Sequence, residues 1–175
     1  MIDELGPQSS MAVLFTSGDH STQVRLSALS ERTSKGGSAF LPVDVPEFGG
    51  TAPVLGGISI GYLEGPRVPS APQRTPLPLP FVPTLDRSFT PADTLRVYLE
   101  ATTSASAPAI RPSIEIVDAA NRVVLAPSAS FTTGRPLKIT APIELKSLAP
   151  GPYMIRASVT DGTATARRES GFVIR

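Results

Sequence analysis

The amino-acid sequence predicts an all-β protein, and three observations support this class. The 175-residue chain contains 19 prolines and 14 glycines between short apolar segments, a distribution that favours strands and turns over long helices. Several segments alternate apolar and polar residues, which is the pattern of strands with one buried face. Hydrophobic residues make up 41% of the chain and aromatic residues only 6%, so the core is expected to consist mainly of Val, Ile, Leu and Ala.

The N-terminal part, residues 1–62, is expected to be a partial β-sandwich. Short apolar segments predict strands at residues 11–16, 22–29, 39–45 and 56–63, with residues 17–21 turning the first strand into the second. In the last of these strands, Ile58, Ile60 and Tyr62 share one face. Because so few strands rarely stand alone, they either belong to an earlier sandwich or add to the sheet formed further along the chain.

A weak internal repeat favours the first of these alternatives. Residues 24–43 and 155–174 each carry Arg-x-Ser on an outward face, then a polar turn, then Ser-x-Phe in the closing strand, if one residue is gapped. Internal similarity of this kind is the mark of a repeated structural unit. We therefore expect residues 11–45 to be the tail of a preceding sandwich.

Residues 63–85 form a proline-rich segment that includes the run Pro-Leu-Pro-Leu-Pro-Phe-Val-Pro. Such a segment is expected to be extended, partly as polyproline II, and to act as a stiff linker. Its spaced prolines also permit an interpretation as a ligand of SH3-type domains, although linkers of this composition are commoner.

Residues 86–175 are expected to form one sandwich of about seven strands. Short strands are predicted around Phe89 and at residues 94–102, 112–118, 121–126, 137–145, 152–161 and 169–175. Turns are expected at residues 119–121 and at Asp161-Gly162, where glycine tolerates a positive φ. The predicted inward positions recur at every second residue: Leu95, Val97, Leu99, Ala101, Ile139, Ala141, Ile143, Leu145, Tyr153, Ile155, Ala157, Val159, Phe172 and Ile174.

The segment Leu-Ala-Pro-Gly-Pro-Tyr predicts the subclass of sandwich. In immunoglobulin-like domains, a tyrosine near the start of the penultimate strand donates a hydrogen bond back across the preceding turn. Leu148, Pro150, Gly151 and Tyr153 fit such a tyrosine corner, with an ordinary tyrosine at a strand start as the alternative. Ile155 occupies the position where antibody-type domains carry a cysteine, so packing is expected to replace the disulfide. We therefore expect an immunoglobulin- or fibronectin-like sandwich.

Candidate catalytic residues are few. Residues 57–61 match the G-x-S-x-G pattern of a nucleophile elbow around Ser59, but an elbow requires a helix directly after the serine and His and Asp partners later in the chain. A proline-rich segment follows Ser59, and His20, the one histidine, precedes it. We therefore expect Ser59 to be an outward strand residue and the protein to be no enzyme.

Metal, cofactor and nucleic-acid sites are not expected. The sequence has one histidine, no cysteine and no closely spaced run of aspartates, so neither zinc nor calcium ligands cluster. It also has no glycine-rich phosphate loop before a helix. The net charge of +1 does not indicate nucleic acid or an anionic membrane as a partner. Arg167 and Arg168 are interpreted as edge-strand charges that discourage sheet-to-sheet aggregation.

Several segments resemble a known family. They are VDVPEFGG, LGGISIGYL, LPFVPTLDRSFTPADTLRVYLEA, IEIVDAANRVV and the C-terminal LKSLAPGPYMIRASVTDGTATARRESGFVIR. Together they are similar to the C-terminal β-rich region of bacterial von Willebrand factor A-related domain proteins. The most specific part is the Leu-x-Pro-Gly-x-Tyr corner followed by an arginine-rich approach to Phe-x-Ile.

The resemblance implies an exported protein, periplasmic or secreted, of which this chain is an incomplete piece. A start at a methionine inside a longer reading frame would explain why residues 1–10 do not look like a signal peptide. The Asp-x-Ser-x-Ser metal motif of functional A domains is absent, so no metal-dependent adhesion is implied for any residue here.

The sequence therefore predicts a non-enzymatic module with a structural or protein-interaction role, contacting a protein partner or neighbouring domains of its own polypeptide. The competing prediction is a sandwich that binds a ligand such as carbohydrate, which needs exposed aromatic rings. The chain has no Trp and three Tyr. Because Tyr153 is assigned to the corner, Tyr62 and Tyr98 are the candidate rings. A hydrolase that uses Ser59 is the third and weakest prediction.

Overall fold

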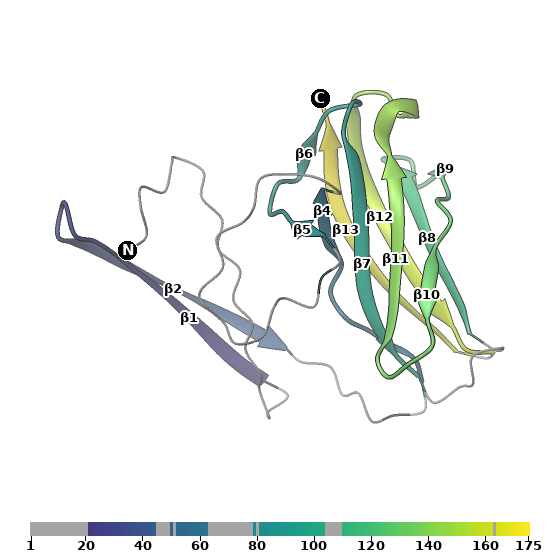
Figure 1. Cartoon of the computed structure of the whole chain (residues 1–175), viewed down its shortest axis with the longest axis horizontal. Coiled ribbons are helices and arrows are strands. Elements are labelled where there is room, and N and C mark those ends of the chain that lie inside the picture. The colour runs from purple at the N-terminus through teal and green to yellow at the C-terminus, as the bar shows by residue number, and fades with distance from the viewer. Residues whose placement is uncertain are drawn as a thin grey trace. The chain divides into compact units, whose positions relative to one another are not determined.

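The structure is a computed structural model, and it describes residues 21–44, 50, 52–62, 79, 81–103, 110–162 and 164–175. These residues are nearly all in strands, with a single 3-10 turn at Leu145–Ser147 and no α-helix among them. The chain divides into two compact units, a β-hairpin and a β-sandwich (Figure 1). The all-β prediction is confirmed.

The hairpin consists of β1 (Ser21–Ser30) and β2 (Lys35–Asp44). The two strands are antiparallel and in register along their whole length, from Ser21 opposite Asp44 to Ser30 opposite Lys35. Both were predicted as strands. The strand predicted at residues 11–16 and most of the turn predicted at 17–21, including His20, lie outside the described residues.

The first sheet of the sandwich has the order β10-β11-β7-β4-β5, with β3 also paired to β7. Its strands are β3 (Val54–Leu55), β4 (Ser59–Tyr62), β5 (Val82–Pro83), β7 (Thr94–Thr102), β10 (Ser130–Thr132) and β11 (Leu137–Glu144). The long β7–β11 pair forms its centre, and every pairing in this sheet is antiparallel.

The second sheet has the order β6-β13-β12-β8-β9. Its strands are β6 (Ser88–Phe89), β8 (Arg111–Asp118), β9 (Val123–Leu125), β12 (Gly151–Thr160) and β13 (Thr165–Ile174). Only the short β6–β13 pair is parallel. The strands of immunoglobulin-type sandwiches are lettered A to G in chain order. Here β7, β11 and β10 take the places of strands B, E and D in one sheet, and β8, β12 and β13 take those of C, F and G in the other, so the order is that of an immunoglobulin-type sandwich.

The domain boundary predicted at residue 62 differs from the observed strand pairing. Ile60 lies opposite Val97, and Leu55 lies opposite Ala101, so β3 and β4 belong to the sandwich. Leu55 and Ile60 are 2% and 1% exposed, which they could not be at the edge of a separate unit. Of the predicted linker, Val82–Pro83 forms β5 against β4, and most of the rest lies outside the described residues.

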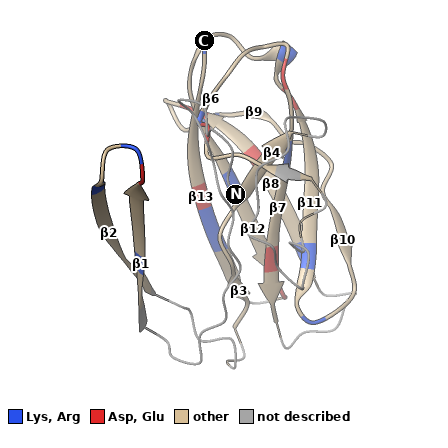
Figure 2. Cartoon of the chain, turned by 60° about the vertical axis from the view of Figure 1, so that its left-hand side comes forward, with Lys and Arg blue, Asp and Glu red and all other residues tan. Residues whose placement is uncertain are grey.

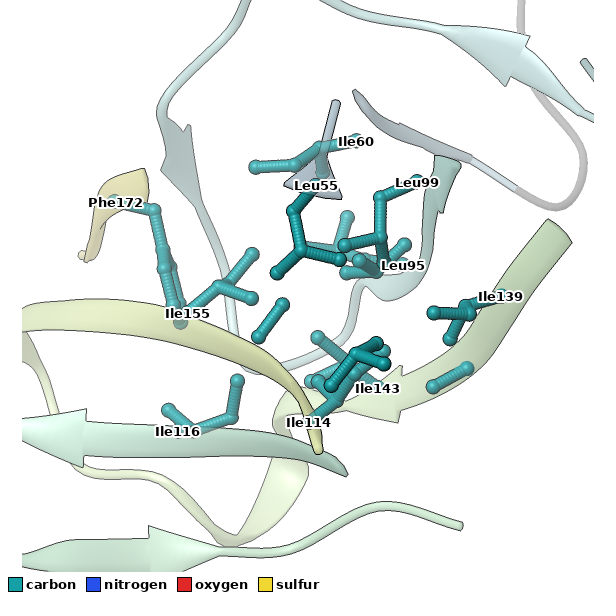
Figure 3. Close-up of a cluster of buried hydrophobic side chains, with 14 of the residues drawn as sticks. Leu55, Ile60, Leu95, Leu99, Ile114, Ile116, Ile139, Ile143, Ile155 and Phe172 are labelled. Carbon is teal, nitrogen blue, oxygen red and sulfur yellow. The ribbon is translucent and has the colours of Figure 1, made fainter. Parts of the chain in front are cut away.

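The core lies between the two sheets and is almost entirely aliphatic (Figure 3). The predicted inward residues of β7 and β11 are all buried, as are Ile155, Ala157 and Val159 of β12. Phe89 and Phe172 add two rings whose centroids are 6.2 Å apart. The period-two alternation of apolar residues therefore predicted this core correctly.

Tyr153 closes one end of the core. Its hydroxyl donates a hydrogen bond to the carbonyl oxygen of Ala149 at 2.8 Å, and its ring stacks on Phe172 with centroids 5.7 Å apart. Gly151 lies between Ala149 and Tyr153 in the sequence. It has φ 152°, a backbone conformation that other residues rarely adopt. Ile155, at the position of the missing cysteine, is fully buried.

A row of charges crosses the outer face of the second sheet. Glu115, Arg156 and Glu169 lie opposite one another on β8, β12 and β13. Arg156 contacts both carboxylates, with Nη1 3.8 Å from Glu115 Oε2 and Nε 3.1 Å from Glu169 Oε1. Hydrogen bonds from Arg167 and then from Arg156 hold the pKa of Glu169 below its ordinary value.

We expect Tyr153→Phe to lower the free energy of unfolding by about 1 kcal/mol, because one hydrogen bond is lost while the acceptor, at the exposed Ala149, can still be hydrated. Thermal unfolding followed by circular dichroism measures the effect. Tyr62→Phe is the matched control, because the Tyr62 ring also packs on a phenylalanine, Phe89, but its hydroxyl donates no hydrogen bond within the described residues. Equal effects of the two substitutions would contradict a stabilising role for the corner hydroxyl.

We also expect Glu169→Gln to reduce the acid sensitivity of the sandwich. A carboxyl whose pKa is lowered by folding stabilises the fold above its unfolded pKa, and this stabilisation is lost as the pH falls through the folded pKa. The difference in melting temperature between the wild type and this variant should therefore be largest near neutral pH and shrink below about pH 4. Glu31→Gln, in the turn of the hairpin, should not change this profile. A pH-independent difference would show that the ion pair is not responsible.

Candidate interaction surface

The register of the hairpin separates its side chains into two faces. Residues that lie directly opposite each other in an antiparallel pair share a face, as do alternate residues along a strand. Val24 lies opposite Leu41, and Leu26 lies opposite Ala39. One face therefore carries six apolar side chains, which we call the apolar face: Val24, Leu26, Ala28, Ala39, Leu41 and Val43.

The opposite face of the hairpin, which we call the polar face, carries polar side chains that contact one another, together with Leu29 and Phe40. Arg25 donates a hydrogen bond to Ser38 Oγ at 3.2 Å, and Ser27 and Ser38 share another at 2.8 Å. The Arg25 guanidinium also lies 5.3 Å from the centre of the Phe40 ring, a cation–π distance. Leu29 and Phe40 are 72% and 58% exposed, so the two faces differ in their polar groups and not in the exposure of their large apolar side chains.

The apolar face is largely exposed. Leu26 and Leu41, at its centre, are 56% and 57% exposed. Among the hairpin's other charged side chains that the structure describes, Glu31 and Arg32 lie in the turn, which Figure 2 shows in red and blue. Lys35 lies opposite Ser30 and therefore shares the apolar face, at its turn end. Contiguous exposed apolar surface on a soluble protein is a common sign of a contact site.

The edges of the hairpin are also unpaired. Within the described part of the chain, β1 pairs only with β2, and neither strand joins another sheet. Ten residues on each strand therefore present one unpaired edge and one uncovered face. A two-stranded hairpin by itself is at best marginally stable in water, so this unit needs additional contacts.

Ser59 does not lie in a nucleophile elbow. It begins β4, which continues to Tyr62 as a strand, and it lies opposite Tyr98 of β7 on the outer face of the first sheet. An elbow needs a sharp turn from a strand into a helix at the serine, and this geometry does not occur at Ser59. His20, its only possible histidine partner, lies outside the described residues.

The two candidate tyrosines for ligand binding face opposite sides of the first sheet. Tyr62 lies opposite the buried Leu95 and packs edge-on against Phe89 with centroids 5.9 Å apart, so its ring points inward. Tyr98 points outward but is only 6% exposed. Its hydroxyl donates to Glu100 Oε1 at 2.6 Å. The two rings therefore do not form a shared platform for a sugar.

A hollow of about 350 Å³ lies beside Tyr98. Its lining is mostly apolar and consists of Leu79, Tyr98, Ser130, Phe131, Thr132, Lys138 and Thr140. Burial and the hydrogen bond to Glu100 raise the pKa of the Tyr98 hydroxyl, so this group stays protonated at neutral pH. Thr140 Oγ1 is buried without a hydrogen-bond partner among the described residues.

The carboxylates accept hydrogen bonds from backbone N–H groups or form ion pairs. Asp118 accepts hydrogen bonds from the backbone N–H groups of Ala120 and Arg122, both at 2.9 Å, and closes the β8–β9 turn. Asp93 accepts from the Thr90 N–H at 2.7 Å. Among the residues that the structure describes, no three His, Cys, Asp or Glu side chains form a group that could hold a metal ion.

Arg167 and Arg168 have different environments. Arg167 pairs with Glu169 on the outer face, whereas Arg168 donates from Nε to the carbonyl oxygen of Leu55 at 3.2 Å. Both lie on the part of β13 that β6 does not pair, since β6 reaches only Val173 and Ile174. Their position agrees with the predicted role at a sheet edge.

The strands of the hairpin could be predicted from the sequence, but its apolar face was not. The signal was present in the alternation of Val24, Leu26 and Ala28 and in that of Ala39, Leu41 and Val43. It could be interpreted only with the observed strand register, because the register decides which residues of β1 and β2 share a face.

Within the described residues, no helix is long and apolar enough to cross a membrane. Neither a scan against protein-family models nor a search of curated proteins found a match to this chain.

Proposed function

We propose that this protein is a non-enzymatic interaction module in which the sandwich is the stable framework and the β1–β2 hairpin makes the contact with another protein. The observation that carries the proposal is the apolar face, whose central leucines are more than half exposed. Its physical basis is the cost of leaving aliphatic side chains in water, about 25 cal/mol for each Å² of apolar surface.

The location and wider context are also part of the proposal. The resemblance to the C-terminal β-rich region of von Willebrand factor A-related bacterial proteins supports a structural role within a larger exported protein, periplasmic or secreted. The absence of cysteine is compatible with this location. The resemblance rests on the Leu148–Tyr153 corner and the arginine-rich final hairpin.

Carbohydrate binding remains the weaker alternative. Sugar-binding faces use exposed aromatic rings, and the ring of Tyr98 is nearly buried while that of Tyr62 points into the core. The hollow beside Tyr98 has one exposed ring at its rim, Phe131, which is 39% exposed. The apolar face of the hairpin is the more extensive exposed apolar surface.

The proposed function can be tested by photo-crosslinking in cells that produce the full chain. A photoreactive amino acid at Leu41, on the apolar face, should give adducts with protein, and the same amino acid at Leu29 should give several-fold fewer. Leu29 is a stringent control, because it is 72% exposed but lies on the opposite face, across from Gly36. The same low yield at both positions would refute the proposed function, and the mass of the adducts would identify the partner.

A further inference from the structure

We propose that the partner of the apolar face is a second copy of this chain, whose hairpin stacks face to face on the first. This inference rests on the proposed function and names the partner for the same surface. The product would be a two-layer arrangement of four strands, with the six aliphatic side chains of each copy between the layers.

Within the described residues, the hairpin lacks a second layer. The other long hairpin of the protein, β12–β13, has the same layout of two ten-residue strands joined by four residues. There, Ile155, Ala157 and Val159 are buried against the opposing sheet. Of the alternate apolar residues of β1, Leu26 and Ala28 are exposed and Val24 is half-buried. A second hairpin would supply the missing layer at the usual spacing of stacked sheets, about 10 Å.

The apolar face also carries little charge. A two-fold contact places like residues near like residues, so a charged face would repel its own copy. The six apolar positions are uncharged, and the one charged side chain of this face among the described residues, Lys35, lies at its turn end. In a stack that places Leu26 and Ala39 of the two copies over each other, Lys35 lies at the end of the contact, where its ammonium group can stay in water. Two copies can therefore meet without burying this charge.

The shape of the apolar face also favours a second copy. Over its three central cross-strand pairs, the size of the side chains decreases towards the turn. The cross-strand pairs are Val24–Leu41, then Leu26–Ala39, then Ala28–Gly37. In an antiparallel two-fold stack, the large pair of one copy lies over the small pair of the other, and the middle pair lies over itself. Facing large and small side chains in this way is how two layers interdigitate.

The size of the contact predicts its strength. Two paired strands of eight residues each cover about 260 Å² of flat area, from a rise of about 3.4 Å per residue and a strand spacing of about 4.8 Å. Even with the relief of the side chains, two copies bury less than the roughly 1,200 Å² at which stable interfaces begin. The dimer should therefore be weak and concentration-dependent.

Sedimentation velocity of the purified full chain tests this inference. The chain should change from monomer to dimer as its concentration rises from about 1 μM to about 1 mM. Leu26→Lys should raise the dimer dissociation constant at least about tenfold, whereas Leu29→Lys should leave it within about twofold. Hydrogen exchange should show that protection of β1 and β2 rises with dimer fraction in the wild type and in Leu29→Lys only.

A second measurement avoids a variant that disrupts the hairpin. Because the chain has no cysteine, Leu26→Cys and Leu29→Cys each introduce a single thiol. A short bis-maleimide reagent should link two copies through position 26, which lies near the two-fold axis, several-fold faster than through position 29. A thermal melt of the sandwich that matches the wild type confirms that each variant is folded.

Three results would overturn the inference: a monomer over the whole concentration range, equal effects of the substitutions at Leu26 and Leu29, or equal linking at the two positions. If the chain is a monomer but Leu41 crosslinks to a different protein in cells, the second copy is excluded while the proposed function stands. If Leu41 gives no adducts and the chain is a monomer, both fail.

Discussion

The structure depends on the burial of aliphatic side chains between two pleated layers. No disulfide links the layers, because the chain lacks cysteine, and the core contains few rings. Ile155 and its neighbours Ala157 and Val159 fill the space between the sheets and are at most 1% exposed. Stability therefore depends on close packing of branched side chains, for which removal of even one methylene group has a measurable cost.

The same constraint makes the hairpin incomplete. A strand pair with one apolar face satisfies its internal hydrogen bonds but cannot remove that face from water by itself. In the sandwich, β12–β13 meets this need by packing its inner face on the opposing sheet. The hairpin of β1 and β2 has the same layout and a similar alternation, but no covering layer within the described residues. The difference between these two units is the physical basis of the proposed contact.

Individual strands could be predicted from the sequence more accurately than the strands with which they pair. Alternation of apolar residues depends on the local backbone, so the inward positions of β7, β11 and β12 could be predicted directly. The sheet to which a strand belongs depends on contacts distant in sequence. For this reason β3 and β4 were assigned to the wrong unit, and the outward Tyr98 could not be predicted to be nearly buried.

The internal repeat of residues 24–43 and 155–174 likewise predicted equivalent hairpins. The repeat requires a gap, however, and a shift of one residue moves side chains to the other face. Phe172 accordingly lies in the core, whereas Phe40 lies beside Arg25 on the polar face.

The two units also differ in how their open strand edges are protected. An unpaired edge can recruit a strand from another molecule, and charged side chains usually prevent this. The unpaired part of β13 carries Arg167, Arg168 and Glu169 in succession, a run that opposes pairing with another chain. In contrast, β1 contains no proline and one charged residue, Arg25. The other strand of the hairpin, β2, contains Lys35 and Pro42, so the sparse protection concerns the β1 edge. Selection against aggregation alone would favour charges along both β13 and β1, so the weak protection of β1 is more consistent with an edge that is covered when the protein is at work.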